Sequence, residues 1–352
     1  MKLNVWGVYL LLLLASVKTF SGCTTVIGSH MAVIHECKDS NTVNYNPATT
    51  KDDDSCIYNN ASSGALANLY PHDTGIEKDP DVRYVEKFDD GMANILGRYN
   101  DIKNSEGMSL DKDVPDGSQS PYAIKITNTG GKNDGGHLLK QFTPGFDGTV
   151  YLRYYVKYPL VSKGYIHHES VWFGGYNPSV DYPDPRAGFC GLGDKRISIA
   201  YEPVTVPAMD TYLYWGDMKS WNGGSSCYGN DMVNGSATAQ NLTWDKWMCV
   251  EVMVKMNDPV TAYNGELRIW QDGVEVGYWG PGFPNGHWAT DSWFNNPADK
   301  AFEGFRWRTD AKLNINYLWI EFYDDKSPVG EDHYIKYANL VMAKKYIGPI
   351  KK

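Results

Sequence analysis

The stretch VYLRYYVKY, residues 150–158, indicates the fold of this 352-residue chain. Side chains of a β-strand alternate between two faces with a period of two residues. One face of this strand carries Val150, Leu152, Tyr154 and Val156, and the other carries Tyr151, Arg153, Tyr155 and Lys157. Residues 248–256 repeat the arrangement. We therefore expect an antiparallel sheet with an apolar core face and an opposite face of rings and charges, a surface that suits a sugar chain.

Alternating segments of this kind recur through the rest of the chain and are bounded by Gly, Pro, Asp and Asn. After a first segment at 82–88, they lie at residues 123–127, 136–142, 149–158, 170–173, 196–201, 212–214, 247–256, 266–271, 302–309, 317–323 and 333–343. Helical periodicity is nearly absent. So many strands without intervening helices predict an all-β fold, namely a two-sheet antiparallel sandwich of the jelly-roll type.

The composition favours some partners over others. Aromatic residues make up 14% of the chain, with 12 Trp and 25 Tyr, which is more than a core alone requires and predicts a ring-lined cleft. The formal net charge of -9 argues against a nucleic-acid partner, whose phosphates demand a basic surface. A local basic cleft can still coexist with an acidic exterior.

The N-terminus is typical of an exported protein. Lys2 precedes a short apolar run at 8–17, and small residues lead into Cys23. This pattern predicts a signal peptide over residues 1–22, and Cys23 stands where a bacterial lipobox carries its lipid-modified cysteine. The run is too short for a membrane span. A secreted protein and an envelope lipoprotein therefore both remain open, with membrane contact only through the lipid, and we expect a monomer.

Two further regions follow the leader. Residues 23–80 are rich in Asn, Thr, Ser and Asp and show little apolar periodicity, which predicts a linker or loosely ordered arm. Residues 81–349 form the predicted jelly-roll domain, which we expect to be carbohydrate-active.

Export makes disulfides permissible. We expect the loop-borne pairs Cys37–Cys56 and Cys190–Cys227, which leave Cys249 in a strand, although spacing alone does not establish connectivity. No cysteine or histidine cluster has the spacing of a zinc site. The acidic turns at 89–91 and 324–325 are either solvated or hold a structural calcium ion; no other cofactor is expected.

Several segments together resemble the concanavalin A-like jelly-roll polysaccharide lyases, especially the alginate and glucuronan lyases. VYLRYYVKY resembles an early long strand of that family, and VWFGG at 171–175 resembles its strand ending in Gly-Gly. Residues 247–273 contain WMCVEVMVKMND and NGELRIWQDG, which resemble its hairpin strands, and IKYANLVMAKKYIG at 335–348 resembles its closing strand. The resemblance spans residues 84–349. It implies a concanavalin A-like fold and cleavage of an acidic, uronate-containing polysaccharide by β-elimination.

The resemblance also implies a set of catalytic residues. In these lyases a base removes the proton next to the uronate carboxylate, a tyrosine commonly protonates the leaving oxygen, and basic or amide groups neutralise the carboxylate. Tyr212 and Tyr214 resemble the family's Tyr-x-Tyr strand, with Tyr214 as the expected acid, and Arg196 stands where the family binds the carboxylate. Alginate-cleaving members carry a lysine where this chain has Tyr176, which argues against alginate itself. His168 is the expected substitute base, with Tyr212 as the alternative.

Strand parity extends the expected site to a sugar-binding trough. Arg153 and Lys157 are expected to clamp the uronate or, equally, to pair with Glu251 or Glu321 across the sheet. The side chains expected to contact the polysaccharide are Arg153, Lys157, Tyr155, Trp172, Tyr176, Glu251, Trp270 and Trp319.

The sequence leaves two alternatives to a lyase. A glycoside hydrolase needs two nearby carboxylates, and Glu251 and Glu321 are the candidates; sandwich glucanases place theirs in one Glu-x-Asp-x-x-Glu run, which this chain lacks. A non-catalytic carbohydrate-binding or envelope protein on the same scaffold is favoured by the missing lysine and by the net negative charge.

Overall fold

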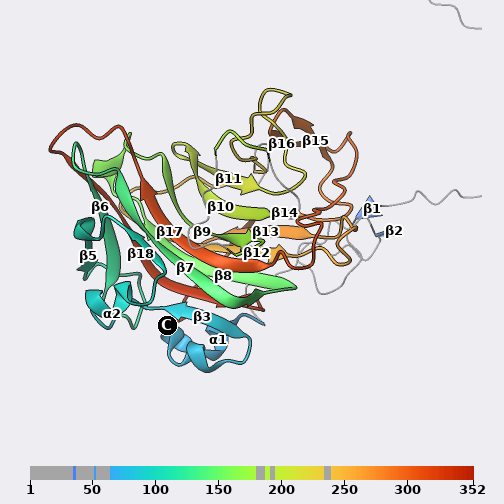
Figure 1. Ribbon diagram of the computed structural model, residues 1–352. Coiled ribbons are helices and arrows are strands. Elements are labelled where there is room, and N and C mark those ends of the chain that lie inside the picture. The colour runs from blue at the N-terminus through green and yellow to red at the C-terminus, as the bar shows by residue number, and fades with distance from the viewer. Residues whose placement is uncertain (1–34, 37–50, 53–63, 180–186, 191–194, 234–238) are drawn as a thin grey trace, which may run out of the picture.

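The computed structural model describes residues 35–36, 51–52, 64–179, 187–190, 195–233 and 239–352 (Figure 1). Within these ranges the chain forms two large antiparallel sheets that pack face to face. The predicted all-β sandwich of jelly-roll type is confirmed.

The two sheets differ in size. The six-stranded sheet has the order β11 (Ala208–Tyr214), β10 (Arg196–Thr205), β9 (His168–Tyr176), β17 (Ile315–Tyr323), β7 (Gly135–Phe146) and β4 (Asp101–Lys103). The eight-stranded sheet has the order β14 (Val274–Trp279), β13 (Glu266–Gln271), β12 (Trp247–Lys255), β8 (Thr149–Lys157), β18 (Asp332–Ala343), β6 (Ala123–Thr129) and β5 (Met108–Asp111), with β3 (Val82–Glu86) also paired to β18.

The remaining elements are short. The two strand pairs are β1 (His35–Glu36) with β2 (Lys51–Asp52), and β15 (Gly286–Ala289) with β16 (Ser292–Asn295). The helices are α1 (Leu66–Leu69) and α2 (Met92–Leu96), together with 3-10 turns at Pro71–Asp73, Ile76–Lys78, Ser105–Gly107 and Leu160–Ser162. No helix in the described part of the chain is both long enough and apolar enough to span a bilayer.

The core lies between the two sheets. Val150, Leu152, Tyr154 and Val156 of β8 all point into it, as their alternation predicted. The six-stranded sheet contributes the facing residues Val171, Phe173, Ile197, Ile199, Leu318 and Ile320. Each such side chain stabilises the fold by roughly 1.5–3 kcal/mol relative to an exposed one. This packing makes the opposite face of each sheet an outer face.

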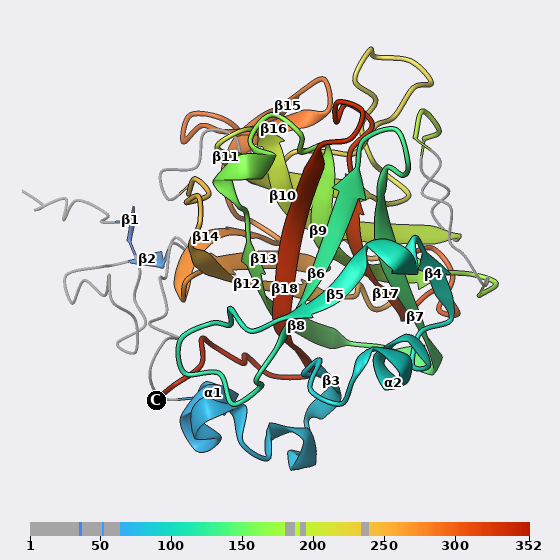
Figure 2. The same cartoon turned by 90° about the vertical axis from the view of Figure 1, so that its left-hand side faces the viewer.

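The outer face of the eight-stranded sheet is covered by the chain's own ends. Residues 65–80, predicted as part of a loose arm, instead pack there, with Leu66 and Ile76 buried against Ile347. The backbone N–H of Leu66 donates to the Tyr346 carbonyl at 3.1 Å. Accordingly α1 and the C-terminus lie side by side in both views (Figures 1 and 2). The apolar residues of this arm are few and show no regular period, so the sequence pattern did not predict that they would be buried.

One predicted strand is absent. Residues 302–309 form no strand, because Gly304 takes φ +94° and interrupts the extended chain. The Phe305 ring stacks on Trp307 with centroids 4.0 Å apart, so the apolar alternation there reflects a packed turn.

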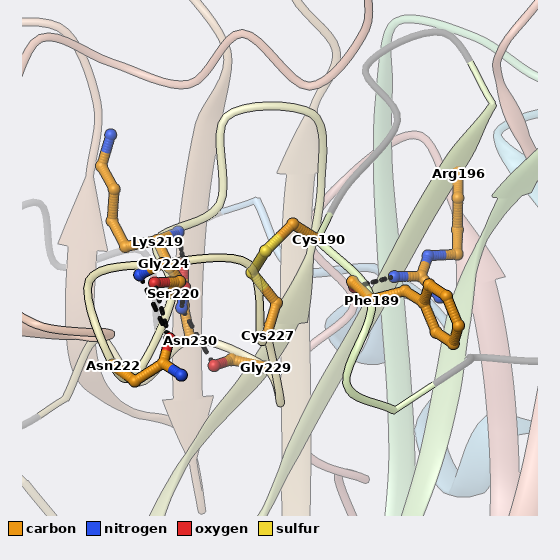
Figure 3. Close-up of a disulfide and its surroundings, with 10 residues drawn as sticks. All are labelled: Phe189, Cys190, Arg196, Lys219, Ser220, Asn222, Gly224, Cys227, Gly229 and Asn230. Carbon is orange, nitrogen blue, oxygen red and sulfur yellow. Dashed lines mark hydrogen bonds between the residues drawn. A yellow bond between two sulfur atoms is a disulfide. The ribbon is translucent and has the colours of Figure 1, made fainter.

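One predicted disulfide is confirmed. Cys190–Cys227 joins the loop after β9 to the loop after β11 (Figure 3), and Cys249 is a buried free thiol in β12. Residues 1–22, Cys23 and the pair Cys37–Cys56 lie outside the described residues.

Candidate active site

A pocket of about 490 Å³ opens on the outer face of the six-stranded sheet. Strands β4, β7, β9, β11 and β17 all contribute to it, together with four connecting segments. The residues that line it are Lys103, Asp134, Gly136, His137, His167, His168, Trp172, Ala187, Tyr212, Tyr214, Tyr228, Trp319, Glu321, Phe322 and Tyr323.

Strand register brings the key side chains onto one face. Trp172 of β9 lies directly opposite Trp319 of β17, and His168 lies opposite Tyr323. On the neighbouring pair of strands, Tyr212 lies opposite the small Ala200. Residues opposite one another in register share a face. The predicted His168, Tyr212 and Tyr214 therefore lie on one layer of the sandwich.

His168 is held by a buried carboxylate. Its Nδ1 lies 2.8 Å from Oε1 of Glu202 on β10, and Glu202 is only 1% exposed. When Nδ1–H donates this bond, Nε2 on the far edge of the ring is left free of its proton and can act as a base. The His168 and Tyr212 ring centroids are 5.0 Å apart in an edge-to-face arrangement.

The pKa values of His168 and Glu321, which both line the pocket, are raised. Burial lowers the pKa of His168, but the Glu202 carboxylate outweighs it, and the pKa is raised overall. Burial raises the pKa of Glu321 to about 8, with His168 acting against the shift and Glu202 adding to it. Part of the Glu321 side chain stays open to the pocket, so water there reduces the shift. The raised pKa means that Glu321 keeps its proton to a higher pH than an exposed carboxyl does, and in that form it can donate a hydrogen bond.

The two tyrosines differ in accessibility. Tyr214 is only 1% exposed, its hydroxyl donates to that of Tyr212 at 3.3 Å, and the Arg196 guanidinium lies 4.2 Å from its ring centroid. Tyr212 is half-buried. Burial raises the pKa of both hydroxyls, so both phenols stay protonated at neutral pH. Tyr212 is therefore the better-placed proton donor, and Tyr214 lies behind it.

The pocket floor is aromatic and carries unused polar atoms. The Trp172 and Trp319 rings lie 5.9 Å apart, and the His137 ring meets Trp319 edge-to-face at 5.5 Å. Trp172 Nε1 and Glu202 Oε2 are buried and have no hydrogen-bond partner among the described residues. A sugar has the hydroxyl groups that such atoms could bind.

Positive charge is scarce in the pocket. Among its described lining residues, Lys103 is the only lysine or arginine, and its Nζ lies 2.9 Å from Asp134. Arg196 lies at the edge, beneath Tyr214. Tyr176 is on the same face, four residues beyond Trp172 along β9 and outside the lining.

Three predicted sugar contacts lie instead on the eight-stranded sheet. Arg153 is fully buried and forms an ion pair with Asp73, with Nη1 and Oδ1 3.1 Å apart. Glu251 accepts the backbone N–H groups of residues 347 and 348, and the Tyr155 hydroxyl accepts that of residue 350. Their assignment to the trough was wrong, because the terminal segments already cover this outer face.

The same correction applies to Lys157 and Trp270. Lys157 lies 2.7 Å from Asp113, and the Trp270 ring packs on Tyr346 with centroids 4.9 Å apart. Lys157 is in β8 and Trp270 is in β13, both strands of the eight-stranded sheet, and neither lines the pocket. Of the predicted substrate-binding residues, Trp172 and Trp319 line the pocket.

Glu202 was not identified from the sequence, and Glu321 was considered as a hydrolase carboxylate or as an ion-pair partner of Arg153 or Lys157, not as a residue of the lyase site. A signal for Glu202 existed, since it shares parity with Arg196, Ser198 and Ala200 on β10. It was overlooked because the predicted strand ended at residue 201.

The acidic turns have protein partners. Asp324 accepts from Ser327 Oγ and from the backbone of Lys326, and Asp90 pairs with Arg98. In the described ranges, no three His, Cys, Asp or Glu residues gather closely enough to hold a metal ion.

Comparison with known proteins found similar chains among solved structures. No family model matches the chain, and no curated protein sequence matches it. Among solved structures, an alginate lyase from Chlorella virus is 15% identical with a TM-score of 0.42, covering 72% of this chain and 98% of its own. An alginate lyase from Aplysia kurodai is 15% identical with a TM-score of 0.48, covering 75% and 99%.

A third structure is an endo-β-1,4-glucuronan lyase from the fungus Trichoderma reesei. It is 10% identical with a TM-score of 0.44, covering 77% of this chain and 100% of its own. These are the jelly-roll polysaccharide lyases that the sequence motifs resemble. Likenesses at this level carry no argument about activity, which depends on the site itself.

Proposed function

We propose that this protein is a polysaccharide lyase that cleaves an acidic, uronate-containing polysaccharide by β-elimination. The observation that supports it most is the pairing of His168 with buried Glu202 at 2.8 Å, beside Tyr212 and above a floor of two tryptophans. A base, an acid and a ring-stacking floor are the groups that this reaction requires in one place.

The proposed step moves two protons. His168 Nε2 takes the proton from the carbon next to the uronate carboxylate, and that C–H electron pair forms the new carbon–carbon double bond. The bond to the glycosidic oxygen breaks, and the Tyr212 hydroxyl protonates that oxygen as it leaves. Glu202 stabilises the imidazolium that forms, because its carboxylate already accepts from Nδ1.

In this proposal the group that hydrogen-bonds the uronate carboxylate is a carboxylic acid, Glu321, rather than a lysine or an arginine. The pocket's one lining lysine among described residues is paired with Asp134. Protonated Glu321 would instead donate a hydrogen bond to the uronate, as a buried carboxylic acid with a raised pKa can. Arg196 would add positive charge from behind Tyr214.

The test is a panel of polyuronates, with the ultraviolet absorbance of the unsaturated product as readout. His168→Ala and Tyr212→Phe should each lower kcat/KM by about 10²- to 10⁴-fold, the usual contribution of one acid or base. His287→Ala is the matched control, since that exposed histidine pairs with Asp299 outside the pocket. Full activity in His168→Ala would disprove the assignment of the base.

A non-catalytic carbohydrate-binding protein is the second candidate, favoured by the scarcity of positive charge in the pocket. It predicts no absorbance from any polyuronate, together with retardation on a polysaccharide affinity gel. A retaining glycoside hydrolase is less well supported. Glu202 is buried and engaged by His168, and Asp134 is paired with Lys103. This leaves Glu321 as the unpaired carboxyl among the described lining residues, whereas that reaction needs two carboxylates.

The site of action is part of the proposal. The Cys190–Cys227 disulfide supports an exported protein. We also propose a cleaved leader over residues 1–22, lipid attachment at Cys23 and a monomeric state. Mass spectrometry of the mature protein would detect cleavage before Cys23 and an attached lipid.

A further inference from the structure

Three large aromatic side chains stand in solvent beside the pocket. Phe189 is 64% exposed, Trp221 51% and Tyr228 45%. Tyr228 also lines the pocket, and its ring meets that of Trp221 edge-to-face with centroids 6.2 Å apart. Trp221 therefore continues the pocket wall outward from Tyr228, and Phe189 is carried by the loop that contributes Ala187 to the lining. Exposed rings next to a binding pocket commonly mark a binding surface.

The loops that carry these rings are tied together. The Cys190–Cys227 disulfide joins them, and the backbones of Gly188 and Cys227 exchange two hydrogen bonds, of 2.8 and 3.3 Å. The second loop is also held by the Asn230 side chain, which bonds the backbone of Lys219 in both directions (Figure 3). Rings carried by two loops that are already held in place lose little conformational freedom when a ligand binds, and this favours affinity.

The two joined loops are connected to the candidate active site through the Arg196 side chain and through the backbone of β11. Arg196 Nη2 donates to the Phe189 carbonyl at 3.4 Å (Figure 3). The same guanidinium lies 4.2 Å from the Tyr214 ring centroid. The backbones of Asn230 and Leu213 also bond each other in both directions, so the second loop runs along the edge of β11.

We propose that Phe189, Trp221 and Tyr228 form an outer saccharide subsite, which stacks one further pyranose ring of the chain whose reacting sugar occupies the pocket. This inference rests on the proposed binding of a polysaccharide. A sugar fits better than an apolar protein segment, because Trp221 is followed by the polar, exposed Asn222 and Ser225 and preceded by the half-buried Ser220. Pyranose rings present apolar faces and hydroxyl edges, and so match rings set among polar groups.

The test compares substrates of increasing length. Trp221→Ala and Phe189→Ala should lower kcat/KM by about three- to tenfold on long oligouronates, the loss expected for one aromatic contact. They should leave the shortest cleavable oligomer unaffected. Phe294→Ala, which removes an exposed ring on β16, is the matched control and should change neither. An equal loss at every length, or no loss at any length, would overturn the subsite.

Binding separates this inference from the lyase proposal. Titration calorimetry of the full chain carrying His168→Ala, with and without Trp221→Ala, measures saccharide affinity without turnover. Weaker binding of long oligomers alone in the double variant supports the subsite even if the wild-type protein cleaves nothing. Equal affinities of the two variants for all lengths would refute it, whether or not the protein is a lyase.

Discussion

At the scale of single residues, the chemistry of the pocket depends on neighbours that are remote in sequence. Glu202 lies 34 positions from His168, yet their side chains are in hydrogen-bond contact. Its carboxylate both orients the imidazole and stabilises the charged form. Glu202 is thus a positioning residue that we expect to set the pH dependence of the reaction.

Glu202→Gln should shift the acidic limb of the kcat/KM profile to lower pH. His168 works as a base only when unprotonated, and the carboxylate raises its pKa, so removing that charge lowers the pKa and extends activity toward acid. The rate on the plateau should also fall, because the imidazolium loses its stabilising charge. Glu275→Gln, on β14 of the other sheet, is the control. An unmoved limb in Glu202→Gln would show that His168 is not the titrating base.

The tyrosine pair gives a second prediction. Tyr212→Phe should cost about 10²- to 10⁴-fold in kcat, the range for a lost general acid. Tyr214→Phe should cost about tenfold or less, because that buried hydroxyl bonds Tyr212 and lies behind it. Single-turnover rates measured on one polyuronate check the order of the two variants. A larger loss in Tyr214→Phe would return the acid to Tyr214, the residue that the family resemblance favoured.

At the scale of elements, the Gly-Gly pair of VWFGG has a steric explanation. A Cβ at Gly174 would lie 2.0 Å from the Ile197 carbonyl oxygen, and one at Gly175 would lie 1.8 Å from that of Asn314. Neighbouring backbone therefore passes too close for any side chain. The Gly-Gly pair is therefore required by the close packing of β9. This steric origin explains why the motif predicted the fold better than the substrate.

The segment that covers β8 and β12 gives an element-level prediction. Asp73→Ala should lower the free energy of unfolding by about 3–5 kcal/mol, because it leaves the Arg153 charge buried without its partner. Chemical denaturation followed by tryptophan fluorescence measures the change. Asp81→Ala removes the partner of the exposed Lys345 and should cost about 1 kcal/mol or less. Since both pairs lie away from the pocket, kcat/KM of the folded protein should stay unchanged in both variants.

At the scale of the whole molecule, buried carboxyl groups make stability depend on pH. Burial raises the pKa of Glu251 to about 7 and those of Glu321 and Asp231 to about 8. A carboxyl with a raised folded pKa stabilises most below its unfolded pKa, and that contribution is lost as the pH rises toward the folded value. Burial lowers the pKa of His137 and His167. The contribution of these two histidines to the free energy of unfolding is therefore lost as the pH falls below 6.5, opposite to the trend for the carboxyl groups.

These opposing trends predict maximal stability in mildly acidic solution. The free energy of unfolding should be larger near about pH 6 than near about pH 9. Glu321→Gln should reduce that difference by about 1–3 kcal/mol, a range lowered for the partial exposure of the side chain. Urea titrations at the two pH values measure both quantities. An unchanged difference in the variant would mean that Glu321 is ionised throughout.

The sequence by itself determined most of the long strands and which face of each enters the core. Val150–Val156 and Val171–Phe173 illustrate this, because burial of alternate apolar side chains depends only on the two-residue period and on the hydrophobic effect. Parity also grouped His168 with Trp172, and Tyr212 with Tyr214, on the faces that the structure gives them.

Only the tertiary structure decided what covers each outer face. The alternation of β8 looks the same whether Arg153 and Tyr155 face a ligand, solvent or another segment of the chain. The segments at 65–80 and 344–350 pack on that face because their apolar residues and backbone groups meet partners there. The six-stranded sheet keeps its pocket open instead. Contacts between residues far apart in sequence produce no periodic pattern in either segment. The location of the site depended on such contacts, so the sequence pattern could not determine it.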